Sequence, residues 1–170
     1  MKKGMILIIC ILMLAFSSFV IAQDAVTPQD VVDKVTEAAA FLAENGEEGL
    51  SAFNQADGPW VWGGTYVFVF DCDAGVIAAH PNNDLVGVEL GSREDVNGFK
   101  YNLALCEEAG KPNGGWVEYW RPTDTMDAEG NQEYRRKISY IVSVDGQPYQ
   151  VGAGIYEPDM TVDELNALTE

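Results

Sequence analysis

Residues 66–80 constrain the fold more than any other part of this 170-residue chain. The first five of them alternate aromatic and β-branched side chains, which is typical of a strand covered on both faces. Residues 71–75 then supply turn formers and a glycine that can take a positive φ, and residues 76–79 resume the apolar pattern. This stretch therefore predicts a β-hairpin at the centre of a sheet.

The start of the chain has the pattern of a secretory signal peptide. Lys2 and Lys3 precede an uncharged apolar run, and small residues end it at Ala22. We expect cleavage after Ala22, which leaves residues 23–170 as one exported domain, periplasmic or secreted. An uncleaved anchor is the alternative, because a helix over residues 4–22 would be about 28 Å long and would reach across the inner membrane.

The chain is strongly acidic, with a formal net charge of −17. A domain with this charge repels nucleic acid and anionic membrane surfaces, so we expect neither as a partner. We interpret the acidity as a solubilising surface. Residues 71–75 begin like a calcium loop, but the glycine comes one position early and Asn82 stands where a glutamate is needed. We therefore expect no metal site.

The sequence has few residues suited to catalysis. His80 is the only histidine, which excludes a histidine pair on a metal. The chain contains no Gly-x-Ser-x-Gly nucleophile motif and no glycine-rich phosphate loop. A Cys–His nucleophile pair would need a cysteine beside His80, and cysteines of exported proteins are more often oxidised. We expect a protein that is not an enzyme and that uses no cofactor.

Two cysteines belong to the predicted exported domain, Cys72 in the hairpin turn and Cys106 in the next predicted helix. An even number of cysteines in an oxidising compartment favours a disulfide, which would contribute about 4 kcal/mol on the chain-entropy model. Two separate, partly buried thiols are the alternative.

An amphipathic helix is predicted after the signal peptide. Thr27 is a typical N-cap, Pro28 occupies the first helical position, and apolar residues recur at helical spacing from Val31 to Leu42. The patterns further along predict a helix over residues 95–110, strands over 116–122, 135–144 and 149–156, a polar loop over 124–133, and a short helix over 161–170. The order is helix, hairpin, helix and three antiparallel strands.

Six short blocks follow one another within residues 29–156. They are the hairpin with its Asp-x-Asp-x-Gly turn and residues 79–82, 85–90, 115–119, 137–141 and 151–156. Together they resemble the single Cache domain, the extracytoplasmic sensor module of bacterial chemoreceptors and sensor kinases. The resemblance implies an α/β (α+β), PAS-like fold, with a long N-terminal helix packed on a five-stranded antiparallel sheet. It also implies a cavity on the other face and the sensing of small carboxylates.

The resemblance also implies candidate ligand-binding residues. They are Trp62, Tyr66, His80, Tyr119 and Lys137, together with Arg93 on the connecting segment. Lys137 lies on a predicted strand, where a buried cation needs an anion from the protein or from a ligand. Strand parity separates Lys137 from Ile138 and Tyr140, which we expect on the helix-packing face. Gly152 and Gly154 share a face of the last strand, where the missing side chains admit a helix or leave room for a ligand. The alternative for each candidate is a structural role.

These observations predict an exported sensory domain that binds a short carboxylate or a similar small organic molecule. No second apolar span or output domain follows in the sequence, so we expect it to act in signal transduction or chemotaxis with a separate membrane chemoreceptor or sensor kinase. The alternative is an extracytoplasmic interaction or structural protein that keeps the scaffold without a ligand. A polar-lined cavity containing Lys137 would favour the sensor.

Overall fold

The computed structural model describes residues 25–169, so the predicted signal peptide or anchor lies outside the described residues. The helices are α1 (Pro28–Asn45), α2 (Tyr101–Ala109) and α3 (Val162–Asn166), and the 3-10 helices are η1 (Gly46–Asn54), η2 (Asn83–Leu85) and η3 (Leu90–Ser92). The strands are β1 (Val61–Trp62), β2 (Thr65–Asp71), β3 (Val76–Ala79), β4 (Gly115–Met126), β5 (Gln132–Ser143) and β6 (Tyr149–Tyr156). None of the described helices has the length and apolar character needed to cross a membrane.

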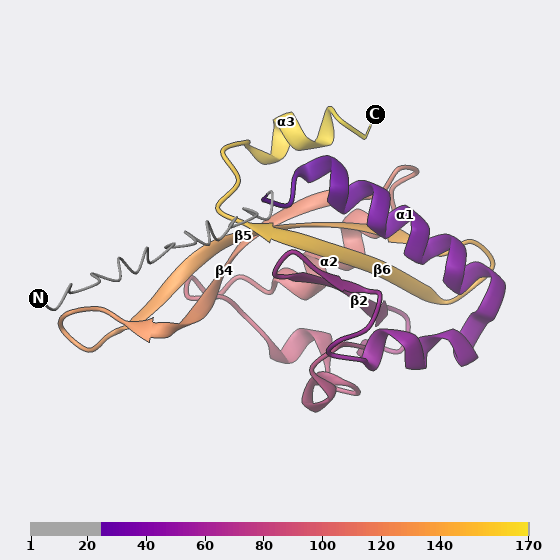
Figure 1. The fold of residues 1–170 in the computed structure, drawn as a ribbon, viewed down its shortest axis with the longest axis horizontal. Coiled ribbons are helices and arrows are strands. Elements are labelled where there is room, and N and C mark those ends of the chain that lie inside the picture. The colour runs from indigo at the N-terminus through magenta and orange to yellow at the C-terminus, as the bar shows by residue number, and fades with distance from the viewer. Residues whose placement is uncertain (1–24, 170) are drawn as a thin grey trace, which may run out of the picture.

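The strands form one antiparallel sheet that has α1 on one face and α2 on the other (Figure 1). Its order is β2, β6, β5 and β4, and both β1 and β3 pair with β2. The predicted PAS-like α/β architecture is therefore confirmed. The sheet has one strand more than predicted, because the two residues of β1 pair with the start of β2.

Helix α1 begins at its predicted cap and lies across one face of the sheet (Figure 1). Thr27 and Asp30 form a capping box, in which Thr27 Oγ1 accepts the Asp30 N–H at 3.2 Å. The apolar stripe from Val31 to Leu42 is fully buried against β5 and β6. This packing makes the α1 face the main hydrophobic core.

The predicted hairpin is formed by β2 and β3. Gly75 has a φ of 73°, and its N–H donates to Asp71 O at 2.9 Å. Asp71 Oδ1 also accepts the Ala74 N–H at 2.8 Å, which closes the turn. Along β2 the side chains alternate, so that Val67 packs in the α1 core while Phe68 packs on the α2 side.

The second helix is shorter than predicted, because it begins at Tyr101 instead of residue 95. Asp95 Oδ1 accepts the N–H groups of Asn97 and Phe99 at 2.8 and 3.0 Å, and Gly98 has a φ of 77°. A side-chain oxygen that bonds nearby backbone N–H groups favours a turn over a helix. Phe99, which lies inside the predicted helix, is 42% exposed as a result.

Strands β4 and β5 continue beyond the body of the sheet as a two-stranded arm (Figure 1). The prediction of a long loop over residues 124–133 was wrong, since only residues 127–131 lie between the two strands. Asp127 Oδ1 closes this turn by accepting N–H groups from Glu129 and Asn131 at 3.0 and 2.8 Å. Backbone pairing rather than apolar burial forms the arm, and hydrophobic periodicity does not reveal such a structure.

Candidate ligand-binding site

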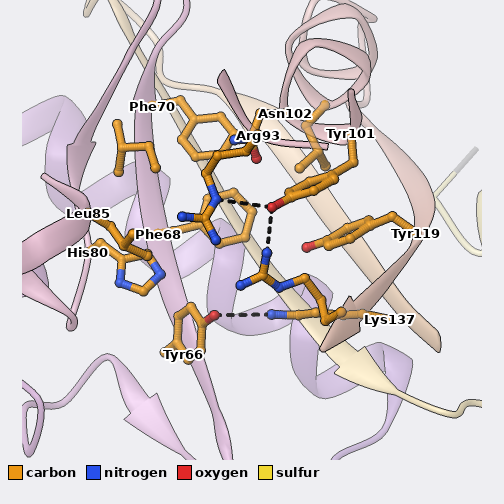
Figure 2. A pocket seen from close by; sticks show the side chains of 13 residues that line it. Tyr66, Phe68, Phe70, His80, Leu85, Arg93, Tyr101, Asn102, Tyr119 and Lys137 are labelled. Atoms are coloured by element: carbon orange, nitrogen blue, oxygen red, sulfur yellow. Dashed lines mark hydrogen bonds between the residues drawn. The ribbon is translucent and has the colours of Figure 1, made fainter. Parts of the chain in front are cut away.

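The α2 face of the sheet contains a small cavity of about 40 Å³ (Figure 2). The residues that line it are Tyr66, Phe68, Phe70, Ile77, His80, Leu85, Arg93, Tyr101, Asn102, Leu105, Tyr119, Arg121 and Lys137. At about 10–15 Å³ for each water, this volume corresponds to about three waters or to a ligand of a few non-hydrogen atoms.

Strand parity places most of the cavity wall. Tyr66 and Phe68 are two residues apart on β2, so both point toward α2. Tyr119 and Arg121 have the same spacing on β4. Lys137 comes from β5, while Ile138 and Tyr140 of the same strand pack in the α1 core, which confirms the predicted separation.

Lys137 is buried in this wall, with only 2% of its surface exposed. Its Nζ donates to Tyr66 OH at 3.5 Å and lies 4.5 Å from the centre of the Tyr66 ring and 5.2 Å from that of Tyr156. Burial lowers the pKa of Lys137 to about 8; Tyr156 opposes this shift, and the positive charge of Arg121 adds to it. Among residues 25–169, no carboxylate forms an ion pair with this amine.

Two arginines enter the same cavity and share one hydroxyl group. Arg93 Nε and Arg121 Nη1 both donate to Tyr101 OH, at 3.2 and 2.5 Å (Figure 2). Tyr101 in turn stacks on Tyr119, with the ring centres 4.2 Å apart. With Lys137, the described lining holds three cations and no carboxylate. The cavity is thus a positive site in a chain whose formal net charge is −17.

His80 adds a neutral donor to the wall. Its Nδ1 accepts the Asn82 N–H at 2.9 Å, and its ring meets the Tyr66 ring edge-on at 4.8 Å. Burial lowers the pKa of His80 to about 4, and the positive charges of Lys137 and the two arginines add to this shift. Because Nδ1 is an acceptor, the neutral ring carries its proton on Nε2.

The tyrosine hydroxyls are further donors. Burial raises the pKa of both Tyr66 and Tyr119, so both stay protonated near neutral pH. Tyr119 OH is 2.9 Å from Ser139 Oγ, which fixes its direction. The wall therefore presents mainly hydrogen-bond donors and positive charge, a combination suited to an anion.

The two glycines of β6 make room for the side chains of the wall. A Cβ on Gly152 would lie 2.7 Å from Phe68 Cζ, and one on Gly154 would lie 2.9 Å from Lys137 Cε. The missing side chains thus admit neighbouring side chains rather than a helix. Gly154 leaves room for the side chains of Ser139 and Lys137.

Five of the six predicted binding residues meet at the cavity: Tyr66, His80, Arg93, Tyr119 and Lys137. Trp62 does not, because β1 pairs only with the first residues of β2 and places Trp62 beside α1. There it packs against the α1 core and lines a separate surface hollow with Asp33 and Lys34.

Arg121 and Tyr101 were not among the predicted binding residues. Arg121 lies two residues after Tyr119 on one strand, so the parity argument applied to β4 would have found it. Tyr101 lies inside the helix that was predicted to start at residue 95. Because the helix in fact begins at Tyr101, the prediction did not identify this residue as buried against the sheet.

A disulfide joins Cys72 to Cys106, whose Cα atoms are 5.8 Å apart. It ties the turn between β2 and β3 to α2, the helix that supplies Tyr101 and Leu105 to the cavity. The covalent link therefore helps to hold one wall of the cavity in place.

Metal-binding potential is low in the part of the chain that the structure describes. Residues 25–169 contain no group of three or more His, Cys, Asp or Glu side chains arranged to hold a metal ion. The polar groups that converge at the cavity are cations, hydroxyls and an imidazole. Such groups suit an anionic ligand rather than a cation.

The chain is similar to known sensor domains. A Cache domain family model matches residues 63–161. A solved structure described as the periplasmic sensor domain of a chemotaxis protein is 23% identical, with a TM-score of 0.54 over 75% of this chain and 88% of that chain. Another, described as the structural basis for carboxylic acid recognition by a Cache chemosensory domain, is 20% identical, with a TM-score of 0.54 over 75% of this chain and 86% of that chain. No curated protein sequence matches. Because the family match covers more than half of the chain, this protein belongs to the Cache domain family.

Proposed function

We propose that the cavity binds the carboxylate of a small organic acid and that the domain acts as an extracytoplasmic sensor of that acid. The observation that carries the proposal is the convergence of Arg93, Arg121 and Lys137 on one small cavity whose described lining has no carboxylate. Arg93 and Arg121 are half-buried and Lys137 is buried, and burying a positive charge without a counter-charge is costly. A ligand carboxylate supplies the missing negative charge.

The rest of the wall supports a short apolar tail on the ligand. Phe68, Ile77 and Leu105 line the cavity beside the cations. A volume of about 40 Å³ favours an acid with very few carbon atoms. The solved structure described in terms of carboxylic acid recognition by a Cache chemosensory domain supports the same ligand class.

The proposed role is binding and signalling without catalysis. The predicted signal peptide and the fold shared with a periplasmic sensor domain of a chemotaxis protein support an extracytoplasmic location. The occupied domain would then act on a separate membrane chemoreceptor or sensor kinase. The polar, Lys137-containing cavity favours this role over a scaffold without a ligand.

A thermal-shift screen tests the proposal. The protein is heated with acetate, propionate, pyruvate, amino acids, amines and purines. A ligand at about 100 times its Kd stabilises by about 2.7 kcal/mol, which raises the Tm by several degrees. We expect carboxylates to give this shift, and Lys137→Met and Arg121→Gln to remove it. Lys100→Met is the matched control, since Lys100 is exposed and does not line the cavity.

Three outcomes would contradict the proposal. A carboxylate shift that persists in Lys137→Met and Arg121→Gln would place the binding site elsewhere. A preference for amines or purines would show that the positive charges of the cavity do not select the ligand. A screen in which no compound shifts the Tm would favour the scaffold that carries no ligand.

A further inference from the structure

We propose that the acid is a 2-oxo acid and that Lys137 binds it covalently and reversibly, as an imine on its Nζ. This inference rests on the proposed function and names the ligand class within it. It assigns different tasks to the three cations: the two arginines hold the carboxylate, and the amine of Lys137 attacks the adjacent carbonyl carbon.

The Lys137 amine is positioned to react with a ligand in the cavity. Lys137 Nζ lies in the wall of the cavity, and its polar contact is Tyr66 OH at 3.5 Å (Figure 2). In residues 25–169 no carboxylate pairs with it. Its surroundings are the faces of Tyr66 and Tyr156 and the charge of Arg121. A lysine that is desolvated and next to another cation is the kind that forms Schiff bases with carbonyl compounds.

The neutral fraction of the Lys137 amine is raised, and only the unprotonated amine is a nucleophile. Burial and Arg121 bring the pKa of Lys137 to about 8, although Tyr156 opposes the shift. At pH 7 about one Lys137 in ten would be neutral, against about one in three thousand for an ordinary lysine. A bound carboxylate raises this pKa again, and the positive charge of Arg121 opposes that rise.

Arg93 and Arg121 keep N–H donors that are free to bind a ligand carboxylate. A guanidinium has five N–H groups, and Arg93 and Arg121 each use one of them on Tyr101 OH. The remaining donors can bind a carboxylate in a bidentate manner. In a 2-oxo acid the carbonyl carbon is bonded directly to the carboxylate carbon. A cavity of about 40 Å³ that contains both arginines and Lys137 would bring that carbon to the amine.

The reaction needs no further reagent. The neutral amine adds to the C2 carbonyl, forming a C–N bond and a carbinolamine hydroxyl. The hydroxyl then leaves as water, and the C=N bond forms as the second amine hydrogen is lost as a proton. Tyr66 OH, at 3.5 Å from Nζ, is placed to pass these protons. Hydrolysis reverses the step, so the ligand is released unchanged, as a sensor requires.

Reductive trapping tests the proposal. Protein purified after expression of the full chain is incubated with pyruvate and sodium cyanoborohydride, and its mass and lysine-containing peptides are measured. We expect one adduct, with the mass of pyruvate less one oxygen atom, on Lys137 in preference to the exposed Lys100 and Lys111. Propionate should compete with labelling, and acetone, which has no carboxylate, should label far more slowly.

Variants and pH separate this inference from the proposed function. Lys137→Arg should bind propionate but give no adduct at residue 137, and Arg121→Gln should lower the labelling rate at least tenfold. Labelling by pyruvate should become faster from pH 7 to pH 9. If pyruvate and propionate raise the Tm but the adduct is absent or spread evenly over the lysines, the imine is overturned and carboxylate binding stands. If no carboxylate raises the Tm and no adduct forms, both proposals fail.

Discussion

The two faces of the sheet differ in what the same strands place on them. On the α1 face, β5 contributes Ile138 and Tyr140 to a continuous hydrophobic core. On the α2 face, the alternate β5 residues Lys137 and Ser139 lie with tyrosines and arginines at the cavity: Lys137 lines it, and Ser139 Oγ contacts Tyr119 OH. Since side chains alternate along a strand, one strand builds both the core and the site. The α1 face thus supplies stability that lets the α2 face hold unfavourable buried charge.

The faces also differ in how their helices are held. The long α1 packs through a fully buried stripe, from Val31 to Leu42. The shorter α2 leaves Leu103 42% exposed and is joined to the hairpin by the bond between Cys72 and Cys106. The α2 face therefore adds a covalent link to the packing of its own core, in which Leu105 and Ala109 are buried, whereas the α1 face depends on packing alone.

Removing the disulfide should have the largest effect on this contrast. The double variant Cys72→Ser and Cys106→Ser loses the closure of a loop with a separation of 34 residues. We expect about 4 kcal/mol less stability on the chain-entropy model. Hydrogen exchange should become faster in α2 than in α1. Equal acceleration in both helices would show that the disulfide does not act on the α2 face in particular.

Truncation in the α1 core should come next. Ile138 is fully buried there, so Ile138→Ala should lower the free energy of unfolding by about 2–5 kcal/mol, as measured by urea unfolding. Carboxylate affinity, measured below the unfolding transition, should change little. A large loss of affinity in this variant would mean that the binding site on the α2 face depends on packing on the α1 face.

Replacing the adjacent β5 residue, Lys137, should raise the free energy of unfolding instead of lowering it. The Lys137 pKa is lowered from 10.5 to about 8, so the unfolded state binds more protons between these pH values and stability rises with pH across them. At pH 7, Lys137→Met should stabilise the ligand-free protein by about 3 kcal/mol, and the gain should vanish above pH 10.5. Urea unfolding of both proteins at pH 7 and above pH 10 measures this. A destabilised Lys137→Met at pH 7 would mean that Lys137 has a structural partner.

Filling the space beneath Lys137 should have the smallest effect. A Cβ on Gly154 would overlap Ser139 Oγ and would lie 2.6 Å from Ile138 O and 2.9 Å from Lys137 Cε. Gly154→Ala should therefore cost about 1–3 kcal/mol and also weaken carboxylate binding, because Ser139 and Lys137 must both move. Gly91→Ala is the control, since its Cβ would come no closer than 3.9 Å to Leu103. Equal Tm and affinity in both variants would show that Lys137 has room to spare.

Regular alternation made much of this arrangement predictable. The hairpin, the capped α1 and the bounds of β6 follow from apolar periodicity and turn chemistry, and Lys137 was assigned to the correct face by parity alone. Burial patterns in strands report directly on which face is covered.

Features that do not depend on apolar periodicity were missed. The arm of β4 and β5 is made by backbone pairing between polar segments, and α2 starts late because the Asp95 carboxylate stabilises a turn. The meeting of Arg93 with Arg121 at Tyr101 OH joins residues from three different segments. A contact of this kind depends on tertiary placement, which local patterns do not contain.

The most direct test of the account is whether the cavity selects negative charge. Acetate and propionate, and the uncharged amides of the same shape, are titrated into the protein by calorimetry. Charge-assisted hydrogen bonds to Arg93, Arg121 and Lys137 predict that the acids bind about a hundredfold more tightly than the amides, or about 3 kcal/mol. Amides that bind as tightly as the acids would contradict the central claim that the three cations lining the cavity form an anion site.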